Sequence, residues 1–206
     1  MIDLYTWATP NGWKVSIMLE AVGAEYRVIP VDITQQAQFQ SHFLAISPNN
    51  KIPAIVDHDY ADGAPISLFE TGAILIYLAE KYGKFMPPSP RNRYEVHEWL
   101  MWQMGGFGPF LGQAHHFNRF APEVVPYAVS RYNKEAQRLW GVLDTRLSER
   151  SFVVDELSIA DFAIYPWAKR HAYQNIEPED FANVWRWMQQ METLPAVQSG
   201  MLVPSI

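Results

Sequence analysis

The pattern of apolar and polar positions divides the chain into a mixed first part and a helical second part. Short apolar-rich runs predict strands at residues 2–6, 26–31, 53–56 and 66–68. Between the first two strands, Thr9 suits the N-cap of a helix, Pro10 its first position and Gly23 its end. Another helix is predicted from Glu70 to Gly83, and residues 38–45 are expected to form a short helix or an irregular turn. This order predicts a βαβ unit followed by a ββα unit, with a right-handed crossover.

After residue 90 the apolar spacing is helical throughout. Residues 83–90 contain several prolines and no periodicity, which is typical of a linker. Helices are expected at residues 91–104, 110–118, 122–148, 158–168 and 181–191, with a short last helix from 194. We expect the segment Gly105–Pro109 to break or kink the first of these. The sequence therefore predicts an α/β domain at residues 1–82, a linker at 83–90 and an all-α domain at 91–206.

One helix start in the second part is specified with particular clarity. Ser158 is followed three residues later by Asp161, which matches the pattern of a capping box. Leu157 and Phe162 flank it as a hydrophobic staple would. Ser158 and Asp161 are therefore interpreted as structural residues.

Composition and charge exclude several classes of protein. The 206 residues are 49% hydrophobic and carry a formal charge of −6 without a basic stripe, which argues against nucleic acid as a partner. No run approaches the roughly 18 apolar residues that span a membrane. The start of the chain, Met1–Leu4, has no basic region and does not resemble a signal peptide. We therefore expect a protein of the cytoplasm.

The absence of cysteine restricts the chemistry further. Disulfides, thiolate metal sites and a cysteine nucleophile are all removed. Disulfides are rare in the cytoplasm, so this composition agrees with the expected location. Thiol chemistry would require the thiol of a bound molecule.

The stretch from Ser47 to Asp57 is a polar loop that runs into a short apolar strand. Pro53 has no backbone N–H and suits the start of a strand. The residue before a proline is pushed to extended geometry, so Ile52 would present its N–H and C=O beside the strand end. Such groups can pair with a peptide as an added strand does. The pattern alone leaves open an ordinary structural proline.

Three motifs carry a resemblance that spans the whole chain. The segments Asn50–Ile55, Glu70–Ile74 and Leu157–Asp161, at this spacing, resemble cytosolic glutathione transferases. Residues 9–12, 47–53 and 108–117, which include the pair His115 and His116, are similar to the nu-class bacterial disulfide-bond reductases, relatives of a yeast nitrogen-regulation protein. The resemblance implies a thioredoxin-like N-terminal domain, a C-terminal helical bundle and a homodimer.

Glutathione would be the co-substrate, and its parts can be matched to residues. Thr71, at a helix start, offers a hydroxyl and an N–H to the γ-glutamyl carboxylate, and Glu70 can pair with the ligand ammonium. Ile52 would pair with the cysteinyl backbone, and we expect the Ile52–Pro53 bond to be cis. Glu70 and Thr71 also suit simple helix capping.

Other predicted contacts rest partly on the resemblance. Lys51 could meet the glycyl carboxylate, and the resemblance implies that Gln38 also contacts the tripeptide. Arg131 would reach the ligand held mainly by the neighbouring subunit, and its planar fork suits a carboxylate. The alternative for all three is a solvated surface position.

The thiol of bound glutathione would be the chemical centre. Thr9 and Asn11 lie at a helix start, where a hydroxyl, an amide N–H and the helix N-terminus all favour a thiolate. Thr9 could instead serve only as an N-cap, so Asn11 is preferred for direct contact. Tyr5 lies inside the first strand and is not assigned this role. No further ligand has a spacing that would make His115 and His116 a metal pair, so no metal is expected, and the two residues are interpreted as a polar lining of the active-site cleft or as packing residues.

The preferred hypothesis is a glutathione-dependent disulfide reductase. Bound glutathione thiolate would attack a small or protein disulfide, and a second glutathione would resolve the mixed disulfide. Conjugation of glutathione to an electrophile, or peroxide reduction, uses the same thiolate and is the enzymatic alternative. A glutathione-binding regulatory module is the non-enzymatic one.

Overall fold

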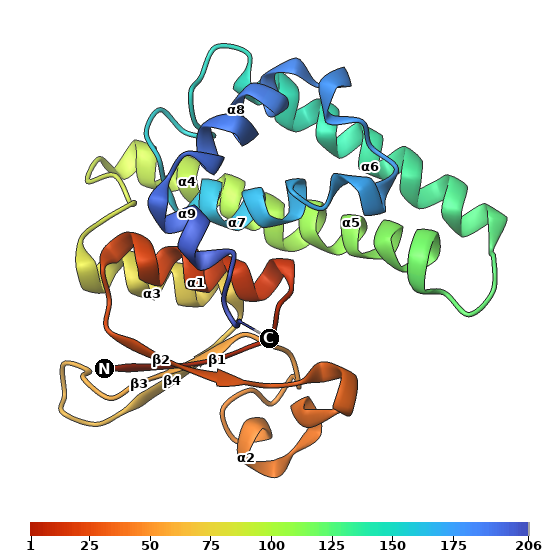
Figure 1. Ribbon diagram of the computed structural model, residues 1–206. Coiled ribbons are helices and arrows are strands. Elements are labelled where there is room, and N and C mark those ends of the chain that lie inside the picture. Colours follow the sequence, from red (N-terminus) through yellow and green to blue (C-terminus); the bar gives the residue numbers. More distant parts are fainter. Residues whose placement is uncertain (206) are drawn as a thin grey trace. The chain divides into compact units, whose positions relative to one another are not determined.

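Residues 1–205 are described by a computed structural model, in which the chain forms two units (Figure 1). The first unit contains residues 1–84 together with the C-terminal stretch from Leu194, and the second contains Phe85–Thr193. The sequence-based division had placed that C-terminal stretch in the helical domain. It joins the first unit because of a close helix–helix contact.

This contact joins α9 (Pro195–Gly200) to α1 (Pro10–Val22). A Cβ atom on Gly200 would lie 2.5 Å from the Cα of Ile17, so only glycine allows the two backbones to approach this far. The hydroxyl of Ser16 donates to the carbonyl of Gly200 at 2.7 Å. Neither feature has a local sequence signature, which explains why the pattern did not reveal it.

The strands of the first unit form one four-stranded sheet in the order β2-β1-β3-β4. The strands are β1 (Ile2–Thr6), β2 (Tyr26–Pro30), β3 (Ala54–Asp57) and β4 (Ile66–Phe69). β1 is parallel to β2 and antiparallel to β3, and β3 is antiparallel to β4. The predicted βαβ and ββ arrangement is therefore confirmed, with strand ends within a residue or two of those expected.

Both faces of this sheet are covered. Figure 1 shows α1 and α3 (Thr71–Tyr82) on one face, and these two helices contact each other. On the other face, 3₁₀ turns lead into α2 (Ser41–Leu44), the short irregular helix that was expected. Phe43 of α2 is fully buried and forms a small core with Val31 and Ala54.

The start of α1 is fixed by local interactions that the sequence predicted. The Thr9 hydroxyl accepts a hydrogen bond from the N–H of Gly12 at 3.2 Å, which confirms Thr9 as the N-cap. A Cβ on Gly12 would lie 2.3 Å from the carbonyl oxygen of Trp7, so glycine is needed where the helix meets the end of β1. Gly23 ends the helix in the left-handed conformation, with a φ of 73°.

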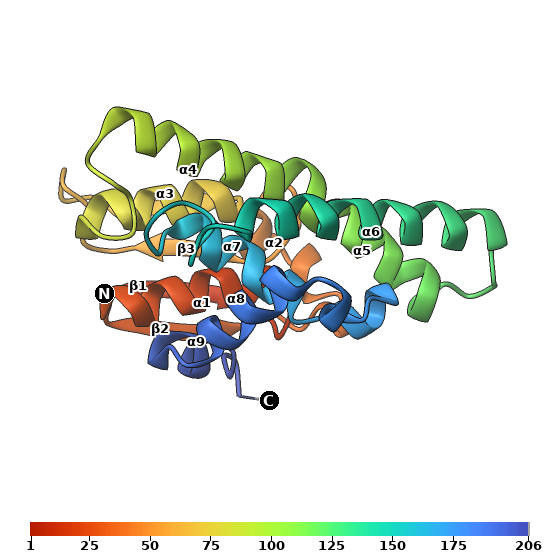
Figure 2. The same cartoon turned by 90° about the horizontal axis from the view of Figure 1, so that it is seen from above.

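The second unit is helical, as expected. Its main helices are α4 (Pro90–Trp102), α5 (Gly108–His115), α6 (Pro126–Leu147), α7 (Ile159–Ala168) and α8 (Ala182–Glu192). Figure 2 shows α5 beside the long α6, and the two helices pack against each other.

The predicted capping box at the start of α7 is confirmed. The Asp161 carboxylate accepts hydrogen bonds from the N–H groups of Val153 and Ser158, and from the indole of Trp187 at 3.0 Å. Asp161 is fully buried, and burial raises the pKa of its carboxyl group to about 6. These bonds tie the start of α7 to α8.

One expectation about helix boundaries is wrong, and another is decided between its alternatives. Gly105–Pro109 interrupts the regular α-helix but does not end it, because a π-helical turn at Gln103–Phe107 leads directly into α5. Gly108 precedes Pro109 yet stays in the α region, which the missing Cβ permits. The expected helix from 122 begins only at Pro126. Val125 precedes that proline and adopts φ −112° and ψ 89°, outside the helical region.

Candidate active site

A pocket of about 150 Å³ in the first unit brings together most of the predicted glutathione-binding residues. It is lined by Asn11, Lys51, Ile52, Pro53, Phe69, Glu70 and Thr71. These residues come from the start of α1, the loop before β3, and the junction between β4 and α3. Segments that are far apart in the sequence therefore meet at one edge of the sheet.

The loop before β3 is held by its own polar groups. The hydroxyl of Ser47, which is fully buried, donates to the carbonyl of Lys51 at 2.8 Å. The N–H of Asn50 donates to the carbonyl of Ser47 at 2.9 Å, and Asn50 has a φ of 50°. These bonds close a turn that leads into Ile52. The pocket wall is thus built from a short, internally bonded segment.

Ile52 presents its backbone at the pocket. Its side chain packs against the small core around Phe43, and its bond to Pro53 is cis, as predicted. The first paired residue of β3 is Ala54. In the described part of the chain, Ile52 takes part in no backbone–backbone hydrogen bond, so its N–H and C=O are available to a ligand.

The start of α3 forms the opposite wall. Thr71 is buried and begins the helix, whose N-terminus favours an anion. Glu70 precedes it with a φ of 71°, a conformation that is uncommon for a residue other than glycine and is frequent in ligand clamps. The Glu70 side chain makes no capping hydrogen bond. Its exposed carboxylate is therefore not used to stabilise the helix start.

The two residues predicted to stabilise a thiolate differ in their position. Asn11 lines the pocket, whereas Thr9 does not. The Thr9 oxygen already accepts the N–H of Gly12, so its capping role is observed. Asn11 remains the better candidate for direct contact with a ligand thiol.

Tyr5 is placed as expected. It lies within β1, opposite Ala54, and its ring lies 6.3 Å from that of Phe43. The side chain thus belongs to the small core on the α2 face of the sheet.

Lys14 is a residue of this region that the sequence interpretation missed. Its side chain is 2% exposed, and its ammonium donates to the Thr71 hydroxyl oxygen at 3.3 Å. Burial lowers the pKa of Lys14 to about 7, while the charge of Glu70 opposes that shift. The signal available in the sequence was a single lysine between two apolar residues, Trp13 and Val15. In the structure both neighbours are buried in α1.

Two predicted glutathione contacts do not line this pocket. Gln38 lies in a 3₁₀ turn of the first unit, and its side-chain oxygen is buried without a hydrogen-bond partner in the described structure. Arg131 belongs to the second unit, where it lines a hollow of about 520 Å³ on α6. The first pocket is therefore formed without either side chain.

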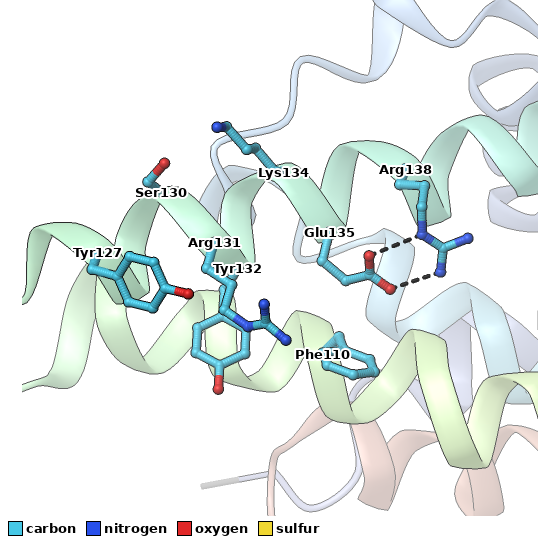
Figure 3. Close-up of a pocket in the computed structure, with 8 residues that line it drawn as sticks. All are labelled: Phe110, Tyr127, Ser130, Arg131, Tyr132, Lys134, Glu135 and Arg138. Atoms are coloured by element: carbon cyan, nitrogen blue, oxygen red, sulfur yellow. Dashed lines mark hydrogen bonds and ion pairs between the residues drawn. The ribbon is translucent and has the colours of Figure 1, made fainter.

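The hollow on α6 is rich in cations and aromatic rings (Figure 3). It is lined by Phe110, Tyr127, Ser130, Arg131, Tyr132, Lys134, Glu135 and Arg138. The guanidinium of Arg138 donates two hydrogen bonds to the carboxylate of Glu135, at 2.9 and 2.7 Å. Arg131 is exposed on the same helix. The excess charge of the hollow therefore comes from Arg131 and Lys134.

The two neighbouring histidines lie in different surroundings. His115 is buried, and its Nε2 lies 3.2 Å from the side-chain nitrogen of Gln174. Burial, assisted by the charge of Arg170, lowers the pKa of His115 to about 4. His116 is exposed and meets the ring of Phe117 edge-on. Across residues 1–205, no group of three His, Asp or Glu side chains could hold a metal ion.

Comparison with known proteins identifies the family. The model described as "Glutathione S-transferase, N-terminal domain" matches residues 1–80, and "Glutathione S-transferase, C-terminal domain" matches residues 117–195. The chain belongs to the glutathione S-transferase family. The predicted fold, a thioredoxin-like domain with a helical domain, is confirmed, and the family makes the chain a transferase or oxidoreductase enzyme.

Individual relatives match along almost the whole chain. The Escherichia coli disulfide-bond oxidoreductase YfcG is 49% identical over 98% of this chain and 95% of its own length. A Pseudomonas putida glutathione transferase with one glutathione disulfide bound per subunit is 42% identical, with a TM-score of 0.95, over 98% of this chain and 91% of that one. A Burkholderia graminis glutathione transferase with two glutathione molecules per subunit is 43% identical, with a TM-score of 0.95, over 98% and 88%.

One further property concerns membranes. Within the described residues, no helix combines the length and the apolar character needed to cross a bilayer.

Proposed function

We propose that this protein is a glutathione-dependent disulfide reductase that uses the thiolate of bound glutathione. The observation that carries the proposal is the meeting of Asn11, the Ile52 backbone and the start of α3 around one pocket. The similarity to a disulfide-bond oxidoreductase and to a transferase that holds glutathione disulfide supports it.

The proposed pose matches each part of the ligand to a group on the pocket wall. The cysteinyl backbone pairs with the N–H and C=O of Ile52, as an added strand would. The γ-glutamyl carboxylate lies at the N-terminus of α3 beside Thr71, and the ligand ammonium meets Glu70. Lys51 is exposed at the rim, where its charge suits the glycyl carboxylate. Gln38 does not line the pocket, so it would contact a part of the tripeptide that extends outside the pocket.

The thiol then lies near the start of α1. The side-chain amide of Asn11 can donate to the sulfur, and the helix N-terminus favours the thiolate over the thiol. Thr9 would assist only through its hydroxyl hydrogen, because its oxygen accepts from Gly12. The chain contains no cysteine, so the nucleophile belongs to the ligand.

The reaction consists of two thiol–disulfide exchanges. The glutathione thiolate attacks one sulfur of the substrate, its S–S bond breaks, and the leaving thiolate takes a proton from water. A second glutathione thiolate attacks the glutathione sulfur of the mixed disulfide. That step releases the second substrate thiol and forms glutathione disulfide. The substrate gains two electrons, and the two glutathione molecules lose them.

The assembly belongs to the same proposal. The protein would act as a nu-class homodimer in the cytoplasm, and Arg131 would reach the ligand of the neighbouring subunit. Arg131 is exposed and, unlike Arg138, forms no ion pair with Glu135, which supports this role.

The test compares two activities of the purified protein. We expect rapid reduction of 2-hydroxyethyl disulfide by glutathione and slow conjugation of glutathione to 1-chloro-2,4-dinitrobenzene. Rapid conjugation without disulfide reduction would replace the proposal by a transferase function. Failure to bind glutathione in calorimetry would remove both enzymatic functions.

A further inference from the structure

The position of Lys14 is costly for a residue with only a structural role. It lies in the first turns of α1 with 2% of its side chain exposed. Taking an ammonium out of water is unfavourable, and an apolar residue of similar volume at such a site is often neutral or stabilising. A buried cation next to a pocket is therefore a candidate for a functional role.

A hydrogen bond of Lys14 to the pocket wall indicates what this role is. Its Nζ lies 3.3 Å from the hydroxyl oxygen of Thr71, the first residue of α3 and part of the pocket wall. In its charged form Lys14 can only donate hydrogen bonds, so the Thr71 oxygen accepts this one. A hydroxyl that accepts from one side directs its own hydrogen to another. Lys14 therefore determines the direction in which the Thr71 hydroxyl can donate its hydrogen.

We propose that Lys14 is a positioning residue that makes the Thr71 hydroxyl a hydrogen-bond donor to the γ-glutamyl carboxylate of glutathione. This inference rests on the proposed function, because it needs glutathione in the pocket. A hydrogen bond to an ionised group is stronger than a neutral one, and the buried cation adds a favourable charge behind the carboxylate.

The charges around the site fit this arrangement. Glu70, next to Thr71, is the group whose charge acts on Lys14 and opposes the loss of its proton. In the proposed pose Glu70 is engaged by the ligand ammonium. The ligand carboxylate then becomes a second anion near Lys14, and it favours the charged form of the lysine. In this pose the negative Glu70 faces the positive ligand ammonium, and the positive Lys14 lies behind the negative ligand carboxylate.

The experiment measures affinity for two ligands by calorimetry. The first is glutathione, and the second is 4-aminobutyryl-cysteinyl-glycine, which has the same ammonium and thiol but no γ-glutamyl carboxylate. Lys14→Met should weaken the binding of glutathione about tenfold or more, the effect of one lost charge-assisted hydrogen bond. Binding of the analogue should change by less than about twofold, because it has no carboxylate to lose.

Three further variants separate this role from a structural one. Lys84→Met removes a lysine of the same unit that donates to the carbonyl of Val22, and it should leave both affinities unchanged. Thr71→Val preserves shape and should reproduce the selective loss. In a protein that carries Thr71→Val, the added Lys14→Met should have little further effect. Lys14→Arg retains a cation that only donates, and it should recover part of the affinity for glutathione.

Several outcomes would overturn the inference. An equal loss of affinity for both ligands in Lys14→Met would mean that Lys14 only maintains the pocket. If Lys14→Met does not fold, Thr71→Val decides, and an unchanged preference for glutathione over the analogue counts against the role. If wild-type protein binds no glutathione, the proposed function fails first. If wild-type reduces disulfides while Lys14→Met keeps its preference for glutathione, only this inference fails.

Discussion

The two pockets present polar groups to a ligand in opposite ways. In the first unit the groups near the thiol and the γ-glutamyl carboxylate are backbone atoms or short side chains (Asn11, Ile52 and Thr71), and neighbouring hydrogen bonds hold the wall, as Ser47 holds the Lys51 carbonyl. In the second unit the groups include long, exposed side chains of α6, such as Arg131 and Lys134, which Figure 3 shows pointing in different directions.

This difference indicates which pocket can hold the atoms of a ligand in fixed positions. A backbone N–H at the end of a strand cannot change its position without a change in the fold, whereas an exposed arginine has many rotamers to lose when it binds. We therefore expect the first pocket to fix the position of the thiol, and the α6 hollow to add affinity. Substitutions in each unit can test this division.

The largest effect is expected where the backbone of the first unit is most crowded. Gly12→Ala would place a Cβ 2.3 Å from the Trp7 carbonyl oxygen. We expect a loss of about 3 kcal/mol in the free energy of unfolding, measured with urea, because backbone atoms must move.

The matched control lies in the second unit. Gly141 is inside α6, and a Cβ there would meet nothing within 4 Å. Gly141→Ala should stabilise the protein by about 0.5–1 kcal/mol, since alanine favours the helix. Equal effects of the two substitutions would contradict the difference in rigidity.

The second unit also has fixed polar groups in its interior, and His115 is one of them. The folded protein keeps His115 neutral, with its pKa lowered from 6.5 to about 4 by burial. The unfolded chain therefore binds a proton first as the pH falls, and the stability that His115 contributes above pH 6.5 is lost down to about pH 4.

The His115→Gln variant should reduce this acid sensitivity. Between pH 7 and pH 4 its unfolding free energy should fall by about 2–3 kcal/mol less than that of wild type. The measurement is urea unfolding at several pH values. His116→Gln removes the exposed neighbouring ring and should keep the wild-type slope. A steeper slope for His115→Gln would mean that the buried ring is protonated in the fold.

Asn11 tests whether the first pocket controls the chemistry itself. Asn11→Ala should lower kcat for disulfide reduction roughly 30-fold, which corresponds to about 2 kcal/mol for one hydrogen bond to a thiolate. The affinity for glutathione should change much less. Asn11→Asp places a carboxylate near the thiolate and should lower kcat further. If neither variant differs from wild type, the thiol is held elsewhere.

The smallest effect is expected at the exposed arginine. Arg131→Ala should raise the KM for glutathione about fivefold, or about 1 kcal/mol, and leave kcat almost unchanged. The effect should shrink as salt is added, because exposed charges are screened. Arg138→Ala is the control, since Glu135 already neutralises that guanidinium. A larger change in kcat than in KM would place Arg131 close to the reacting sulfur.

The same division explains which parts of the site could be predicted from the sequence. Backbone-held features leave local signatures, such as the Thr9 N-cap before Pro10 and the proline after Ile52. These predictions were confirmed. Arg131 has no local signature, because any arginine on an exposed helix face has the same pattern. Only the family resemblance indicated it, and its contact with a ligand stays a prediction.

The errors also have physical causes. The helix that was expected from residue 122 starts at Pro126 because the residue before a proline avoids the α region, a rule that could have been applied to Val125. The opposite exception occurs at Gly108, which has no Cβ and continues the helix into Pro109. Lys14 was missed because periodicity assigns charged residues to the surface. Its partner Thr71 lies 57 positions away in the sequence.

The contact between Gly200 and Ile17 has a consequence for the order in which the protein is made. On the ribosome, α1 and the sheet emerge early, but the surface of α1 that receives α9 stays uncovered until residue 200 has been synthesised. The whole second unit is translated in between. The first unit therefore cannot complete the packing of α1 until the second unit has been synthesised. A message truncated after Thr193 would encode a protein whose first unit lacks α9.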